Sequence, residues 1–376
     1  MGLIKEIEAD LDGVPYPIYI GEGVIDSVVE YVQKKTKNKK IIIITDEFFA
    51  EELAQTVQNL FDSDGFFTFC HIMHAGKGNK NINEVLKIYS ILEENDFARD
   101  STLIAIGGGV IGDLSGFVAS TWLRGMNLIH IPTSLMAMID SSIGGKTAIN
   151  FRHTINGIGS YYHPIANIID LSLIKSLSDR DYNAGLAEVI KCAIINDNLF
   201  YNWLESNHEL IQSRDFSGII EFLSKTIEVK IKHVEGDVKE GSKRLLLNYG
   251  HTLGHSIEIS TTKNGHEQLR HGEGVSVGIA AVAFLATQYL NLDPSIYRSI
   301  KSLLLRYNLP IDISASSLGF DRDKLLSACL KNVNKDKKRL NNKLRLILAT
   351  EIGCASVFSD VPFEFVENAF NEIIKE

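Results

Sequence analysis

The sequence contains only four cysteines among 376 residues, and no two of them form a Cys-x-x-Cys pair. Scattered thiols of this kind are typical of a reduced cytosolic protein rather than a disulfide-stapled secreted one. The N-terminus lacks the apolar segment of a secretory signal, and the longest apolar run, Gly274–Ala286, is too short to span a bilayer. We therefore expect a cytoplasmic protein without a membrane span, in which this run forms a buried helix.

An excess of positive charge is also absent. The formal net charge is −9 and the calculated pI is about 5.7, which argues against nucleic acid or an anionic membrane as a partner. A local group of cations can still bind an anionic small molecule. The 45% apolar content is that of an ordinary globular protein, and the chain length favours two domains.

The first part of the chain alternates strand and helix patterns. Lys40–Thr45 and Thr102–Ile106 read as buried strands, and Ile42–Ile44 is a continuous β-branched run, as expected for a parallel strand covered on both faces. Pro17–Ile20 reads as a third strand, and apolar residues recur at helical spacing in Gly23–Lys35 and Ile82–Asn95. This order predicts an α/β domain over residues 1–177, with a Rossmann-like parallel sheet between two layers of helices.

Beyond about Leu177, strand patterns become scarce and long amphipathic segments follow one another. We expect a mostly α-helical C-terminal domain over residues 178–376. The predicted helices are Ala184–Asn196, Phe216–Val234, Leu245–Ser260, Gly274–Tyr289 and Pro294–Tyr307.

Two glycine-rich phrases are candidates for phosphate binding. Gly107, Gly108 and Gly109 directly follow a predicted strand, where their backbone N–H groups could approach a nucleotide pyrophosphate at a helix N-terminus. A tight turn that needs a positive φ would explain the same glycines. The second phrase, Gly144-Gly145-Lys146-Thr147, resembles part of a P-loop, but the spacing to an earlier glycine fails, which excludes an ATPase.

The phrase L-N-Y-G-H-T-L-G-H (247–255) places His251 and His255 one helical turn apart on the same face. A pair of core or surface histidines would give the same spacing. However, His271 follows in R-H-G-E-G, and Glu188 lies in the apolar helix G-L-A-E-V-I-K. Because catalytic zinc takes three His or carboxylate ligands and an open position, these residues offer a metal site.

Further polar residues occur within apolar or glycine-rich phrases. Glu188 and Lys191 are three apart on one helix, which an ordinary surface ion pair would explain, although their apolar neighbours argue against a solvated face. Four cations near a metal would suit a phosphorylated, polyhydroxylated substrate. They are Lys146, Lys191, Lys230 and Arg244.

Taken together, these phrases resemble the 3-dehydroquinate synthases of the sugar phosphate cyclase superfamily. The resemblance extends over most of the chain. It rests on G-G-G-V-I-G-D-L-S-G-F (107–117), W-L-R-G (122–125), I-P-T-S-L (131–135), D-S-S-I-G-G-K-T-A-I-N (140–150), A-G-L-A-E-V-I-K (184–191), L-L-N-Y-G-H-T-L-G-H (246–255), H-G-E (271–273) and D-K-K (336–338).

The resemblance implies the roles of individual residues. Glu188, His251 and His271 would be the zinc ligands, and His255 would lie beside the metal to transfer protons and position the substrate. Arg124 matches an arginine that reaches the neighbouring subunit's site, which implies a homodimer.

The remaining matched positions surround the substrate or NAD. The substrate residues would be Asp140, Lys146, Asn156, Lys191, Lys230, Arg244, Asn248 and Lys337. The NAD residues would be Asp46, Lys80, Gly108, Gly109, Asp113, Thr133 and Ser134, with Lys146 shared between the two sets.

The implied reaction converts the sugar phosphate 3-deoxy-D-arabino-heptulosonate 7-phosphate to 3-dehydroquinate and phosphate, in the shikimate pathway of aromatic amino acid biosynthesis. In the family, NAD takes a hydride from an alcohol whose alkoxide zinc stabilises as a Lewis acid. Phosphate then leaves by β-elimination, the hydride returns, and the opened ring closes by an intramolecular aldol step. The enzyme would be a lyase that regenerates its NAD. Cobalt could occupy the same donors as zinc.

The sequence departs from the family pattern on the cofactor side. Phe48, Lys77 and Ile155 stand where an asparagine, a glutamate and a lysine are usual. Elsewhere, the segment Thr261–Leu269 is a few residues longer than is usual in the family. Because the substrate side is unaltered, the sequence favours 3-dehydroquinate synthase over other carbocyclases, such as 2-deoxy-scyllo-inosose or amino-dehydroquinate synthases. A metal-dependent polyol dehydrogenase of the same architecture is a further alternative, and a non-catalytic binding protein is the last.

Overall fold

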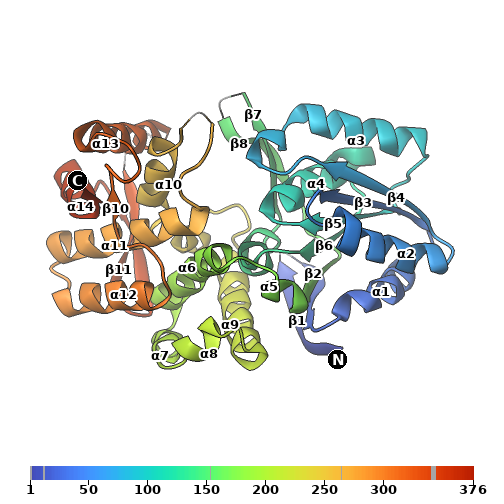
Figure 1. The fold of residues 1–376 in the computed structure, drawn as a ribbon, viewed down its shortest axis with the longest axis horizontal. Helices are drawn as coiled ribbons and strands as arrows, with labels where there is room; N and C mark the ends of the chain where they lie inside the picture. Colours follow the sequence, from blue (N-terminus) through green and yellow to red (C-terminus); the bar gives the residue numbers. More distant parts are fainter. Residues whose placement is uncertain (1, 12, 153, 264, 340–343) are drawn as a thin grey trace. The chain divides into compact units, whose positions relative to one another are not determined.

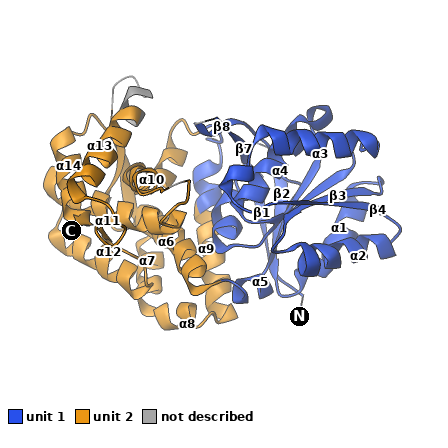
Figure 2. Ribbon diagram, turned by 45° about the horizontal axis from the view of Figure 1, so that its top comes forward, with its two compact units in different colours: residues 1–177, 230–239 blue, residues 178–229, 240–376 orange. Residues whose placement is uncertain are grey.

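The computed structural model describes residues 2–11, 13–152, 154–263, 265–339 and 344–376, and it divides into two compact units (Figures 1 and 2). Unit 1 comprises residues 1–177 together with Lys230–Lys239, and unit 2 comprises Ser178–Val229 and Glu240–Glu376. The sequence predicts that residues 230–239 belong to the second domain. They join unit 1 instead, where Lys230 forms an ion pair with Asp140.

Unit 1 contains a seven-stranded sheet in the order β1-β2-β9-β6-β5-β3-β4. All neighbours are parallel except the edge pair β1 and β2, which is antiparallel. The strands are β1 (Leu3–Leu11), β2 (Val14–Gly21), β3 (Lys40–Asp46), β4 (Phe67–Met73), β5 (Thr102–Gly107), β6 (Asn127–Pro132) and β9 (Ala166–Asp170). The predicted parallel sheet is confirmed, whereas the strand β1 had not been predicted.

Successive residues of the central strands point to opposite faces, so each strand feeds two apolar cores. Ile41 and Ile43 of β3 pack with one core, and Ile42 and Ile44 pack with the other. Helices α1 (Val28–Lys35) and α2 (Gln55–Ser63) contribute to the first core. Helices α3 (Ile82–Glu94) and α4 (Gly109–Thr121) contribute to the second. Each fully buried isoleucine contributes roughly 2 kcal/mol, which explains the uninterrupted run.

The rest of unit 1 consists of short segments and one hairpin. A two-stranded antiparallel hairpin follows β6 and is formed by β7 (Lys146–Phe151) and β8 (Thr154–Tyr161). The short helical segments are η1 (Val24–Ser27), η2 (Ala50–Ala54), η3 (Lys77–Asn79), η4 (Trp122–Arg124), η5 (Ala137–Ser141) and α5 (Ser172–Lys175).

Unit 2 is mostly helical, as predicted. Its helices are α6 (Asp179–Asn196), α7 (Asn198–Ser206), α8 (His208–Gln212), α9 (Phe216–Val234, which enters unit 1 at Lys230), η6 (Lys243–Asn248), α10 (His251–Ser260), α11 (His271–Tyr289), α12 (Pro294–Arg306), α13 (Arg322–Arg339) and α14 (Phe363–Ile373). Its short strands are β10 (Ile313–Ser314), β11 (Arg345–Glu351), β12 (Cys354–Ser359) and β13 (Ile374–Lys375).

Helix α11 lies at the centre of unit 2 and packs against α6, α10, α12 and α14 (Figure 1). Its apolar run is buried, as the sequence predicted for Gly274–Ala286. Glycines let the neighbouring backbones approach closely. A Cβ on Gly278 would lie 2.0 Å from the carbonyl oxygen of Gly250, and a Cβ on Gly272 would lie 1.8 Å from that of Ala184. No helix in the described part of the chain is long and apolar enough to cross a membrane.

The predicted helix Leu245–Ser260 is wrong in one respect, because it is interrupted. The chain forms the 3₁₀ segment η6, turns at Gly250 with φ of 77°, and only then begins α10 at His251. A side chain is excluded at this turn both by the left-handed backbone and by Ile279, whose backbone nitrogen lies 2.9 Å from an added Cβ. The turn makes His251 the first residue of α10.

One buried histidine in unit 1 predicts a pH-dependent stability. Burial lowers the pKa of His130, in β6, from 6.5 to about 4. The folded chain therefore holds the neutral ring, while the unfolded chain takes up a proton below pH 6.5, so stability is lost as the pH falls from 6.5 towards 4. We expect His130 to account for a loss on the order of 3 kcal/mol over this range.

Urea unfolding of the wild type and of His130→Gln between pH 7 and 4.5 measures this effect. As the pH falls, the free energy of unfolding of the wild type should decrease more than that of the variant, which lacks the titrating imidazole. A difference that is constant over the range would contradict the assignment to His130.

Candidate functional site

The glycine loop of unit 1 lies between β5 and α4. Gly107 has no room for a side chain, since an added Cβ would lie 2.5 Å from Cγ1 of Ile111. Gly108 is the N-cap residue of α4, and no side chain caps this helix. At the end of β6, Thr133 donates its backbone N–H to the carbonyl of Gly107 at 3.1 Å. Its hydroxyl is buried without a hydrogen-bond partner among the described residues.

These observations fit a phosphate-bearing cofactor at this loop. The first turn of α4 carries no acidic side chain, so its free backbone N–H groups and the positive end of the helix dipole favour an anion. The unsatisfied Thr133 hydroxyl is a further group that a ligand could bond, since buried polar groups are normally paired. Asp46 ends β3, and burial raises the pKa of its carboxyl.

A cluster of alternating charges joins several predicted residues of unit 1. Lys80 is buried and forms an ion pair with Asp113, while its ammonium also donates to Oδ1 of Asn156 at 2.6 Å. Burial raises the pKa of Asp113 against the opposing charge of Lys80, and the charges of Asp140 and Lys146 also act on it. The structure thus brings together residues predicted for NAD and residues predicted for the substrate.

In unit 2, α6 carries Glu188 and Lys191 in its buried stretch. Their side chains are 1% and 2% exposed, so the pair does not lie on a solvated face. Oε2 of Glu188 forms an ion pair with Lys191. Burial acts to raise the pKa of Glu188, but the charges of Lys191 and His251 outweigh it and hold the pKa well below its usual value. The carboxylate is therefore ionised although it is buried.

The other oxygen of Glu188 faces two histidines. Oε1 lies 3.3 Å from Nε2 of His251 and 3.5 Å from Nε2 of His271, yet it accepts no hydrogen bond among the described residues. Two ligands held at about 2.1 Å in a tetrahedron lie roughly 3.4 Å apart. The spacing of these donors is thus that of a zinc coordination shell.

The far side of each imidazole ring is also occupied. Nδ1 of His251 lies 3.1 Å from the backbone carbonyl of Tyr249, and Nδ1 of His271 lies 3.1 Å from Oε1 of Glu258. Burial acts to lower the pKa of His271, but the neighbouring carboxylates of Glu188 and Glu258 outweigh it and raise the pKa to about 10. Because a coordinating imidazole is neutral, metal binding has to displace this proton.

His255 lies on the more open side of the same group. One ring nitrogen each from His251, His255 and His271 lies within 4.8 Å of the others, so the three histidines could also hold a metal. His251 is buried, the side chain of His271 is 30% exposed, and His255 is exposed. Unit 2 therefore offers two overlapping donor sets, one with Glu188 and one with His255.

The other predicted residues are distributed between the units. Arg244 is buried in η6, and the amide of Asn248 donates to Oε1 of Glu240 at 2.6 Å. Lys337 belongs to α13, but its side chain lies outside the described residues. The predicted substrate residues of unit 1 are Asp140, Lys146, Asn156 and Lys230, and those of unit 2 are Lys191, Arg244, Asn248 and Lys337.

Two residues of this region had not been predicted. Glu258 follows His251 by seven residues and therefore lies on the same face of α10, so the spacing in the sequence is a signal that points to it. Glu240 gave no such signal, because a loop and a 3₁₀ segment bring it to Asn248.

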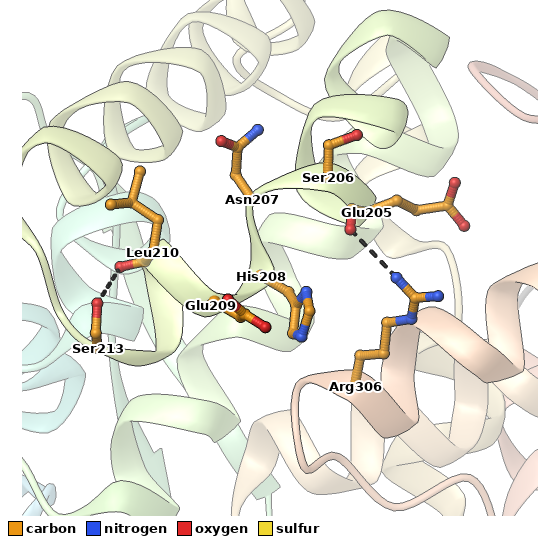
Figure 3. A pocket seen from close by; sticks show the side chains of 8 residues that line it. All are labelled: Glu205, Ser206, Asn207, His208, Glu209, Leu210, Ser213 and Arg306. Atoms are coloured by element: carbon orange, nitrogen blue, oxygen red, sulfur yellow. Dashed lines mark hydrogen bonds between the residues drawn. The ribbon is translucent and has the colours of Figure 1, made fainter.

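A separate surface hollow in unit 2 has no such chemistry (Figure 3). It is formed at the junction of α7 and α8 and includes Glu205, His208, Glu209 and Arg306. The Arg306 guanidinium already donates to the backbone carbonyl of Glu205 at 3.3 Å. None of the predicted site residues lines this hollow, so it is not the candidate site.

Comparison with solved structures identifies the architecture. The chain matches 2-epi-5-epi-valiolone synthase from Streptomyces hygroscopicus, solved with NAD⁺ and Zn²⁺, with a TM-score of 0.82 and 22% identity over 98% of both chains. A 2-deoxy-scyllo-inosose synthase, solved with carbaglucose-6-phosphate, NAD⁺ and Co²⁺, matches with a TM-score of 0.84 and 22% identity over 98% of this chain and 99% of that one. A probable glycerol dehydrogenase from Sinorhizobium meliloti reaches 0.61 at 15% identity over 95% of both chains. These likenesses establish the fold.

Sequence comparison is more specific. Residues 70–184 match the model of the 3-dehydroquinate synthase N-terminal domain, and residues 185–339 match that of the C-terminal domain. The chain is 38% identical to the 3-dehydroquinate synthase of Shewanella sp. over 97% of its length and 98% of the relative's. It is 34% identical to that of Desulforamulus reducens over 94% and 96% of the two lengths. The chain belongs to the 3-dehydroquinate synthase family of sugar phosphate cyclases.

Proposed function

We propose that this chain is a 3-dehydroquinate synthase that converts 3-deoxy-D-arabino-heptulosonate 7-phosphate to 3-dehydroquinate and phosphate, in the shikimate pathway. The observation that carries the proposal is the buried, ionised Glu188 facing two imidazole nitrogens at 3.3 and 3.5 Å, in a chain of this family. We also infer a cytosolic location, because the four cysteines, all within the described residues, form no disulfide.

We propose that Glu188, His251 and His271 hold a zinc ion, with cobalt as a possible substitute. The unsatisfied Oε1 of Glu188 supports this choice over the set of three histidines, because a buried carboxylate oxygen needs a positive partner. His255 is exposed beside these ligands, which suits a group that exchanges protons with substrate and solvent.

Single substitutions distinguish the two donor sets. Glu188→Ala and His271→Ala should each abolish stoichiometric zinc binding, measured by metal analysis after dialysis, and activity should fall with it. His255→Ala should retain the zinc and lose activity. Zinc that is retained by Glu188→Ala and lost by His255→Ala would show that the three histidines are the ligands instead.

We further propose that NAD binds at the glycine loop of unit 1, with Gly108, Gly109, Thr133 and Ser134 near its phosphates. The uncapped α4 and the unpaired Thr133 hydroxyl support this placement. The three departures from the family pattern, Phe48, Lys77 and Ile155, are all exposed, so none of them belongs to the apolar core of unit 1.

The cofactors and the charged side chains have separate roles in the proposed reaction. When bound, NAD supplies the transient oxidation, and the metal supplies Lewis acidity at the oxidised alcohol. Lys191 forms an ion pair with Oε2 of Glu188 and so holds that carboxylate in position. The ammonium groups of Lys146 and Lys230 and the guanidinium of Arg244 suit a departing phosphate, since charge-assisted hydrogen bonds to phosphate are strong.

Phosphate release from the heptulosonate phosphate, with NAD and zinc present, tests the proposed reaction. We expect stoichiometric phosphate, 3-dehydroquinate in the NMR spectrum of the product, and no net NADH. Phosphate released only from glucose 6-phosphate or sedoheptulose 7-phosphate would indicate another carbocyclase. Net NADH without phosphate would indicate a polyol dehydrogenase and would overturn the proposal.

We propose that the enzyme is a homodimer in which Arg124 acts on the partner's site. Leu123 and Arg124 both have left-handed backbones, with φ of 48° and 67°, and both are exposed. Strained non-glycine residues of this kind cluster at functional positions. Leu123 is 46% exposed at the same turn, as expected for a residue that a second subunit covers.

Complementation tests this arrangement. Arg124→Ala and His271→Ala should each be inactive alone. If Arg124 acts in the partner's site, mixing and reassembling the two variants should restore activity to about a quarter of the wild-type sites, because half of the dimers are mixed and each has one intact site. If Arg124 acts in its own subunit, the mixture stays inactive.

A further inference from the structure

The carboxylate of Glu258 is held in the interior of unit 2 against a single polar partner. Its two oxygens lie 3.1 and 3.3 Å from Nδ1 of His271, and the side chain is only 10% exposed. Among the described residues, no other hydrogen bond or ion pair to this carboxylate is found. Burying a carboxylate costs free energy unless a positive or hydrogen-bonding partner compensates it, and the imidazole of His271 is that partner among the described residues.

The neighbouring helix leaves space for this carboxylate. Gly274 of α11 faces Glu258 of α10, and an added Cβ there would lie 2.5 Å from Cγ and 2.6 Å from Oε1 of Glu258. Gly274 does not have a positive φ, so its backbone does not itself require glycine. Glycine is therefore required at position 274 because the side chain of Glu258 occupies the space that a Cβ would need.

The contact determines which nitrogen of His271 is free. With Nδ1 of His271 held by the carboxylate of Glu258, Nε2 is the nitrogen left to coordinate a metal once its proton is displaced. Nε2 is the atom that faces Glu188 at 3.5 Å. His251 is arranged in the same way by the carbonyl of Tyr249, but that acceptor carries no full charge.

We propose that Glu258 is a positioning residue for the metal, which holds His271 in the orientation and tautomer that coordinate, and that Gly274 provides the space it needs. This inference rests on the metal site of the proposed function. A carboxylate behind a histidine ligand fixes the ring and makes the ligand more basic, and its removal typically weakens metal binding 10–100-fold. Glu258 itself does not touch the metal.

Metal affinity tests the inference without any assay of activity. Zinc dissociation constants are measured by competition with a chromophoric chelator for the wild type, Glu258→Gln and Glu258→Ala. We expect binding about 10–100-fold weaker in Glu258→Ala, with a smaller loss in Glu258→Gln, because the amide oxygen still accepts the hydrogen bond but carries no charge. In Co²⁺-loaded protein, the visible absorption band should change in both variants.

A second substitution reaches the same carboxylate from the other helix. Gly274→Ala leaves every proposed ligand in place but displaces Glu258, so it should weaken zinc binding in the same direction. Glu367→Gln, on the exposed face of α14, and Gly78→Ala, where an added Cβ meets nothing within 4 Å, are the matched controls and should bind zinc as the wild type does.

The outcomes separate this inference from the site on which it rests. Wild-type affinity in both Glu258 variants would overturn the positioning role and leave the ligand set standing. A wild type that binds no zinc would overturn both. Melting temperatures without metal identify a variant that is merely misfolded, and the Glu258→Gln result decides the question if Gly274→Ala does not fold.

Discussion

The ionised carboxylate of Glu188 is the constraint on which the rest of unit 2 depends. A carboxylate that is 1% exposed costs several kcal/mol unless positive groups surround it. Lys191 provides one such group from the same helix, and the nitrogens of His251 and His271 face the other oxygen from two more helices. The three helices are therefore tied together by one charge, and loss of any partner leaves that charge uncompensated.

Such an arrangement requires the helices to approach more closely than ordinary side chains permit. Helix axes usually lie 8–10 Å apart, and large residues at the contacts would separate the donors. Gly272 and Gly278 instead place α11 directly against the backbones of Ala184 and Gly250. Gly272 and Gly278 thus set the distance between Glu188 and the two imidazole rings, in addition to their part in the packing of the core.

Features that depend on local periodicity could be predicted from the sequence. The strand β3, the helix face shared by His251 and His255, and the burial of Glu188 all follow from patterns within a few residues. Features that depend on distant contacts could not. The membership of Lys230 in unit 1 depends on Asp140, ninety positions away, and the role of Glu258 depends on a neighbouring helix. The break at Gly250 has a similar origin, since Ile279 helps to impose it.

Helix α9 begins in unit 2 and contributes Lys230 to unit 1, so the boundary near residue 177 is not a clean cut between independent modules. A fragment that ends at Leu177 would contain every strand of the seven-stranded sheet but would lose the ammonium group that pairs with Asp140. Unit 1 is therefore a discontinuous domain, built from two separate stretches of the chain. Recombination or truncation that kept residues 1–177 alone would therefore preserve the seven-stranded sheet and leave Asp140 without the ammonium group of Lys230.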